Sequence, residues 1–213
     1  FLDDVTVRDF VGKYQPNFPL LDVEKPLTFG PLDLYDYYFE HKRQQIEDID
    51  NSKPVILEVA KGFREISGRE YGLFESYHLE DADTAIVVLS SAAGTAKEVV
   101  DELRAKGEKA GLLKPRVFRP FPHREIAQAL SHLKAVAILD RSASFGGFGG
   151  PLFTEIRSAM MEFGKIPENI NIIFGLGGRD INQQDIAGIY DQLDEIVKSG
   201  KVKERVQYVG VRE

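Results

Sequence analysis

The stretch that decides the fold is Ala135-Val136-Ala137-Ile138-Leu139-Asp140-Arg141, followed by the loop Ser142-Ala143-Ser144-Phe145-Gly146-Gly147-Phe148-Gly149-Gly150-Pro151. The apolar run that ends in charged residues predicts a buried strand, and the glycines followed by a proline predict a tight loop and the start of a helix. Strands that are apolar throughout, rather than alternating, are typical of parallel sheets with helices on both faces. The rest of the chain is therefore expected to repeat this order of strand, loop and helix.

Similar apolar runs with turn signals recur on both sides of this stretch. Strands are predicted around residues 83–91, 117–118, 135–140, 169–174 and 206–211. Amphipathic helices are expected between consecutive strands. We therefore predict that residues 83–213 form an α/β domain with an open, mostly parallel five-stranded sheet and helices on both faces.

The first part of the chain, residues 1–82, reads as a linker and helical segment. Pro16, Pro19, Pro26 and Pro31 interrupt the candidate helices there, since proline removes a backbone donor and breaks a helix interior. One helix is expected from Leu32, with Pro31 at its first position, and Pro54 is expected to start a second helix.

Composition excludes several classes of protein. The 213 residues carry a formal net charge of −7, which argues against nucleic acid or an anionic membrane as the main partner. The absence of cysteine removes disulfides, thiolate metal sites and thiol catalysis. No apolar run is long enough to span a membrane, and the first residue is not methionine, which suggests a fragment or a processed product.

In a parallel sheet, ligands and partners meet the loops at the carboxyl ends of the strands. The candidate interface or ligand residues in those loops are Arg119, Arg141, Phe145, Gly146, Gly147, Phe148, Gly149, Gly150 and Arg179. One interpretation of loop 141–151 is an anion or nucleotide site in which backbone N–H groups hold a phosphate. The alternative is that the glycines permit positive φ and a close backbone approach, while Phe145 and Phe148 contact another subunit or domain. We favour the second, because the loop lacks the spacing of dinucleotide and P-loop motifs.

No catalytic, cofactor-binding or metal-binding residue is predicted. The four histidines lie on separate predicted elements without metal-ligand spacing, and the Gly-x-Ser-x-Gly motif of a nucleophile elbow does not occur. Reasoning from the residues alone therefore ends at an α/β domain without a visible active site.

Several short motifs in one order add a family resemblance. They lie at residues 8–16, 27–30, 66–71, 113–122, 139–141, 149–152 and 175–181. Together they resemble the alpha subunit of pyruvate:ferredoxin oxidoreductase, also called pyruvate synthase. The resemblance covers essentially the whole chain and identifies residues 83–213 with a domain like the C-terminal domain of transketolase.

The resemblance implies a cytoplasmic, thiamine-diphosphate-dependent enzyme. Such enzymes decarboxylate pyruvate oxidatively with coenzyme A to acetyl-CoA and CO2 and reduce ferredoxin, or run the reverse reaction. The complex is implied to use thiamine diphosphate, Mg2+, iron–sulfur clusters of the 4Fe–4S type and CoA, and to contain beta, gamma and delta subunits or equivalent domains. Because the family's catalytic residues lie outside this chain, the fragment is expected to serve assembly and to be inactive alone.

Overall fold

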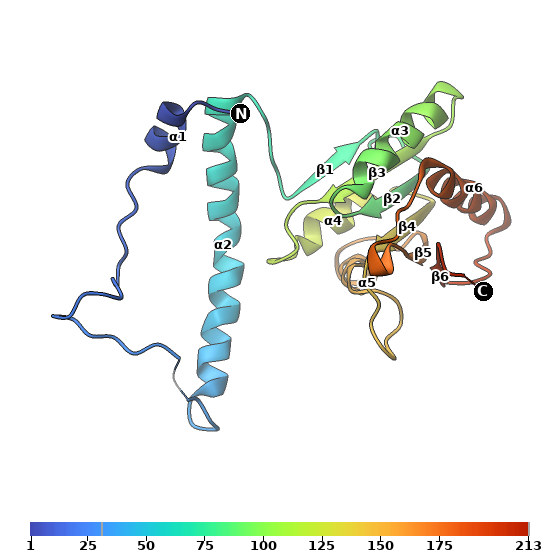
Figure 1. The fold of residues 1–213 in the computed structure, drawn as a ribbon. Coiled ribbons are helices and arrows are strands. Elements are labelled where there is room, and N and C mark those ends of the chain that lie inside the picture. The colour runs from blue at the N-terminus through green and yellow to red at the C-terminus, as the bar shows by residue number, and fades with distance from the viewer. Residues whose placement is uncertain (31, 213) are drawn as a thin grey trace. The chain divides into compact units, whose positions relative to one another are not determined.

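The computed structural model describes residues 1–30 and 32–212 and divides the chain into two compact units, Phe1–Tyr71 and Gly72–Glu213. In chain order the elements are α1 (Asp4–Val11), α2 (Tyr38–Ser67), β1 (Phe74–Tyr77), β2 (Thr84–Val88), α3 (Ala92–Ala105), β3 (Ala110–Pro115), α4 (His123–Leu130), β4 (Ala135–Asp140), α5 (Pro151–Phe163), β5 (Glu168–Ile173), the 3-10 turn η1 (Leu176–Gly178), α6 (Gln183–Ser199) and β6 (Val206–Tyr208) (Figure 1).

The second unit is an α/β domain built on one mixed sheet. Its strand order is β1-β3-β2-β4-β5-β6, and all neighbours are parallel except the pair β1 and β3. The α/β class with an open, mostly parallel sheet is confirmed. The sheet has six strands rather than the five predicted.

Side chains of each central strand alternate between two hydrophobic cores, as the pleat of a strand requires. Ile86, Ala137 and Leu139 pack with α3 and α6, whereas Val87 and Ile138 pack with α4 and α5. Figure 1 shows the two pairs of helices on opposite faces of the sheet. The predicted placement of helices on both faces is therefore confirmed.

Two strand predictions were wrong in detail. The second predicted strand, at residues 117–118, actually lies at Ala110–Pro115, because those residues pair in parallel with β2 and leave Pro115 at the end of the strand. Strand β1 was not predicted, since four residues at the sheet edge give a weak sequence signal. It pairs with β3, which is why the second unit begins at Gly72, whereas the predicted α/β domain begins at residue 83.

The first unit contains one long helix where two were predicted. Helix α2 begins at Tyr38 rather than at Leu32 and runs without a break through Pro54. Pro54 has no backbone N–H, so the carbonyl of residue 50 loses its helical hydrogen bond. Residue 50 is exposed to water, which can replace the lost partner. The predicted role of Pro31 lies outside the described residues.

Candidate functional site

A crevice opens at the carboxyl ends of β2 and β4, at the centre of the sheet. From β2 the chain continues into α3 on one face, and from β4 it continues into α5 on the other. Such a divergence leaves a gap between neighbouring strands, where open α/β sheets bind their ligands. The crevice has a volume of about 310 Å³. Its lining comprises Val88, Leu89, Ser90, Ser91, Ala92, Phe118, Leu139, Asp140, Arg141, Ser142, Pro151, Leu152 and Phe174.

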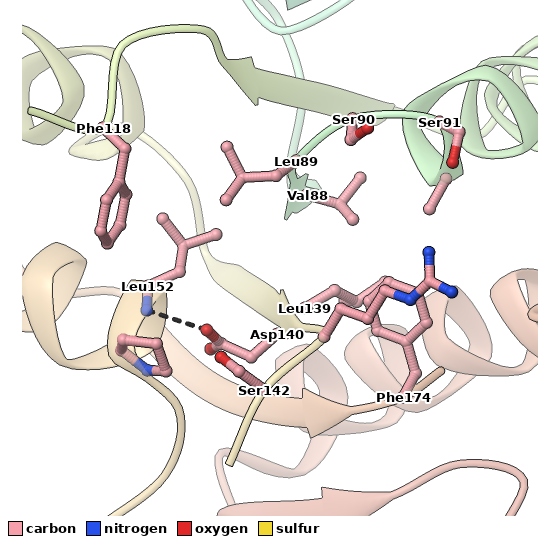
Figure 2. Close-up of a pocket in the computed structure, with 13 residues that line it drawn as sticks. Val88, Leu89, Ser90, Ser91, Phe118, Leu139, Asp140, Ser142, Leu152 and Phe174 are labelled. Atoms are coloured by element: carbon pink, nitrogen blue, oxygen red, sulfur yellow. Dashed lines mark hydrogen bonds between the residues drawn. The ribbon is translucent and has the colours of Figure 1, made fainter. Parts of the chain in front are cut away.

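The two ends of the crevice differ in chemistry. Figure 2 shows Leu89, Phe118 and Leu152 gathered at one end, and Ser90 and Ser91 at the other. Ser90 has a φ of 61°, a left-handed conformation that is unusual for a residue with a side chain. Non-glycine residues in this conformation often occur at functional sites.

Asp140 forms the floor of this site and fastens the start of α5. Its side chain is buried and accepts hydrogen bonds from the backbone N–H groups of Leu152 at 2.8 Å and Phe153 at 3.1 Å. Asn171, buried on β5, donates to Asp140 at 2.9 Å and to the carbonyl of Ile138 at 2.8 Å. Burial raises the pKa of Asp140, while these donors act in the opposite direction. The Asp140 carboxylate therefore caps α5 at its positive end.

The glycines before α5 allow this close approach. A Cβ atom at Gly150 would lie 2.2 Å from the Asp140 carboxyl carbon, and one at Gly149 would lie 2.5 Å from the Phe153 ring. The N–H of Gly150 donates to the Asn171 side chain at 2.8 Å. The backbone donors of Gly150, Leu152 and Phe153 are thus already engaged within the domain, so they offer no free cradle to a phosphate.

The other predicted residues lie along the same edge of the sheet without forming one cluster. Arg119 forms an ion pair with Glu155, which also lies 3.4 Å from a ring nitrogen of His123. Arg141 donates through Nε to the carbonyl of Gly175 at 3.2 Å, and Arg179 donates to the carbonyl of Gly210.

The aromatic residues of the glycine loop are exposed. Phe145 is fully exposed, and 63% of Phe148 is accessible. Phe148 lies beside the Phe153 ring, with ring centroids 6.2 Å apart, and the Arg157 guanidinium lies 5.6 Å from the Phe148 ring. Gly146 and Gly149 have the positive φ that glycine permits, and Gly147 lies in the turn after Ser144.

Sequence reasoning missed Ser90, Asn171 and the role of Asp140. The conformation of Ser90 leaves no trace in the residue type. Asn171 did leave a signal, because two asparagines alternate with the isoleucines of strand β5, and a buried polar side chain there requires a partner. Within the described part of the chain, no three His, Cys, Asp or Glu side chains are grouped so as to hold a metal ion.

Fold and site together define an α/β domain whose central polar network is structural. The chain belongs to the pyruvate:ferredoxin oxidoreductase family, and residues 82–186 match the model of "Pyruvate:ferredoxin oxidoreductase core domain II". Among curated relatives, pyruvate synthase subunit PorA of Thermotoga maritima is 45% identical over 100% of this chain and 53% of that protein. Ketoisovalerate oxidoreductase subunit VorA of Pyrococcus horikoshii is 37% identical over 95% of this chain and 51% of that protein. The chain thus spans about half the length of the curated relatives that it matches.

Two solved structures are similar to this chain at lower sequence identity. A 2-oxoglutarate:ferredoxin oxidoreductase from Magnetococcus marinus has a TM-score of 0.46 and 24% identity, over 57% of this chain and 20% of that chain. A split-gene transketolase has a TM-score of 0.45 and 16% identity, over 59% of this chain and 43% of that chain. Among the described residues, no helix is long and apolar enough to cross a membrane.

Proposed function

We propose that this chain is the C-terminal part of the alpha subunit of a pyruvate:ferredoxin oxidoreductase in the cytoplasm. The observation that carries the proposal is the 45% identity to a pyruvate synthase subunit along the whole chain. The parent enzyme would convert pyruvate and CoA to acetyl-CoA and CO2 and pass electrons to ferredoxin, or run in reverse. Thiamine diphosphate, Mg2+ and iron–sulfur clusters would be held by other parts of the complex.

Within that enzyme, residues 83–213 would serve as a transketolase C-terminal-like domain for assembly rather than for chemistry. The exposed Phe145 and Phe148 support this role, because exposed aromatic side chains among few apolar neighbours tend to mark contact surfaces. Loop 141–151 would contact the beta, gamma or delta subunits or equivalent domains. The alternative of an anion-binding module in this loop is weakened, because its backbone donors at α5 are engaged by Asp140 and Asn171.

An assay of benzyl viologen reduction tests the enzymatic part of the proposal. With thiamine diphosphate, Mg2+ and CoA, the complete complex should reduce the dye with pyruvate as the best 2-oxoacid, whereas this chain alone should give no 2-oxoacid-dependent rate. Activity of the purified chain would contradict the assembly role. A preference of the complex for 3-methyl-2-oxobutanoate over pyruvate would contradict the proposed substrate.

Truncation of the loop aromatic tests the contact surface. Phe148→Ala in the complete subunit should weaken association with the other subunits by about 1–3 kcal/mol, the usual cost of truncating an interface aromatic. Met161→Ala is the matched control, because Met161 is an exposed apolar residue on α5 outside the loop. Equal affinities of the two variants in a pull-down titration would argue against a contact at loop 141–151.

A further inference from the structure

The crevice between β2 and β4 is not explained by a role in assembly. It lies at the position where open α/β sheets bind small ligands, and its volume of about 310 Å³ is at the lower end of ligand pockets. At roughly 30 Å³ for a water-sized group, this volume holds on the order of ten such groups. The size therefore fits a ligand of up to about ten non-hydrogen atoms.

One end of the crevice is lined by three apolar side chains. Leu89, Phe118 and Leu152 converge there (Figure 2), and Leu152 is held in place by its backbone bond to Asp140. An apolar group placed against these side chains would leave water without losing a hydrogen bond, which favours a short aliphatic body.

The crevice is also lined by one positively charged side chain, that of Arg141. Arg141 uses Nε for the Gly175 carbonyl, and within residues 1–30 and 32–212 its guanidinium forms no ion pair with a carboxylate. The only acid in the lining is Asp140, whose oxygens face the N–H groups of α5 and the Asn171 amide. The Nη groups of Arg141 are therefore available for a carboxylate, which guanidinium binds in a planar, bidentate geometry.

We propose that this crevice binds a small aliphatic monocarboxylate. The carboxylate pairs with Arg141, beside Ser90 and Ser91, and the hydrocarbon body lies against Leu89, Phe118 and Leu152. The proposal rests on the crevice alone and stands whether or not the proposed function is correct.

Titration of the isotope-labelled chain, followed by NMR, tests the site with 4-methylpentanoate as the probe. Saturable shifts are expected at Leu89, Phe118 and Leu152, with a dissociation constant below about 10 mM. The uncharged 4-methylpentan-1-ol and the short acetate ion should each bind at least tenfold more weakly. The alcohol lacks the carboxylate, and acetate lacks the hydrocarbon body.

Two arginine variants form a matched pair. Arg141→Gln should lower the affinity for 4-methylpentanoate to that of the alcohol. Arg179→Gln should leave it unchanged, because Arg179 also donates to a glycine carbonyl but lines a separate hollow with Tyr208 and Gly210. Backbone spectra of both variants check that the domain stays folded.

Three outcomes would overturn the proposal. Equal affinities for acid and alcohol would show a purely apolar hollow, and equal effects of the two arginine variants would show non-specific charge attraction. Absence of saturation, together with protection of the crevice when the complete complex assembles, would show that a polypeptide fills it. The viologen assay is independent of each of these outcomes, so failure here does not decide the proposed function.

Discussion

At the scale of single residues, Asp140 on β4 is bonded to the start of α5 and to β5. Its oxygens accept three hydrogen bonds, from the N–H groups of Leu152 and Phe153 and from the Asn171 amide. Asparagine at this position would present one oxygen and one NH2 group to these donors, and at least one buried N–H would lose its acceptor. Because an unsatisfied buried donor costs about 1–3 kcal/mol, we expect Asp140→Asn to lower the free energy of unfolding by about 2 kcal/mol.

Urea unfolding followed by circular dichroism measures this change. Asp180→Asn is the matched control, since Asp180 is an exposed carboxylate, and it should change stability by less than about 0.5 kcal/mol. Similar stabilities of the two variants would mean that the Asp140 network contributes little to folding.

Single residues also show where sequence reasoning succeeds. The glycines before Pro151 predicted positive φ and the close approach of another backbone. Gly146 and Gly149 have positive φ, but Gly150 lies against the side chain of Asp140 rather than against a backbone. The partner itself could not be predicted, because Asp140 and Asn171 meet only when β4 and β5 pair across 31 positions of sequence. The assignment of loop 141–151 to a subunit contact stays a prediction.

At the scale of elements, β1 is held at the edge of the sheet by charge as well as by pairing. Glu75 forms ion pairs with Lys97 of α3 and with Arg116, the latter at 2.7 Å. The hydrogen bond from Lys97 lowers the pKa of Glu75 below its ordinary value of 4.5, burial opposes this shift, and Arg116 adds to it. A carboxylate with a lowered pKa in the folded state contributes stability above its unfolded pKa, and this contribution is lost as the pH falls through the folded pKa.

We therefore expect Glu75→Gln to destabilise the domain by about 1 kcal/mol at neutral pH. The difference from the unaltered chain should shrink as the pH falls below about 4.5 and vanish once the pH is below the lowered folded-state pKa of Glu75. Thermal unfolding across this pH range measures it, with Glu80→Gln, an exposed residue before β2, as the control. A difference that stays constant with pH would show that Glu75 acts through packing instead of charge.

Elements with a strong apolar run were the easiest to predict. The central strands β2, β4 and β5 lie where their sequences indicated, because each is buried on both faces. The edge strand β1 and the position of β3 depend on pairing between distant segments, which no local pattern contains. The prediction that Pro54 separates two helices is wrong, because α2 continues through it. An exposed helix tolerates one missing backbone hydrogen bond.

At the scale of the whole molecule, the two units differ in how much they bury. None of the described residues before Gly72 is buried, whereas the strands of the second unit carry many side chains with no exposed surface. Helices gain most of their stability in proteins from packing of an apolar face rather than from their own hydrogen bonds. The two units should therefore differ in stability when the chain is isolated.

Amide hydrogen exchange of the isolated chain tests this difference, and α2 and α6 provide the decisive comparison. Helix α6 buries Ile186, Ile189, Tyr190, Leu193 and Ile196, whereas α2 buries no residue. If burial determines stability, amides of α6 and of strands β2 and β4 should exchange at least about a thousandfold more slowly than those of α2, because they open only when the core unfolds. Amides of residues 1–30 should exchange fastest, since prolines limit regular pairing there. Equal protection of α2 and α6 would show that helical hydrogen bonds alone hold the first unit. Equal protection of residues 1–30 and strands β2 and β4 would contradict the predicted difference between the units.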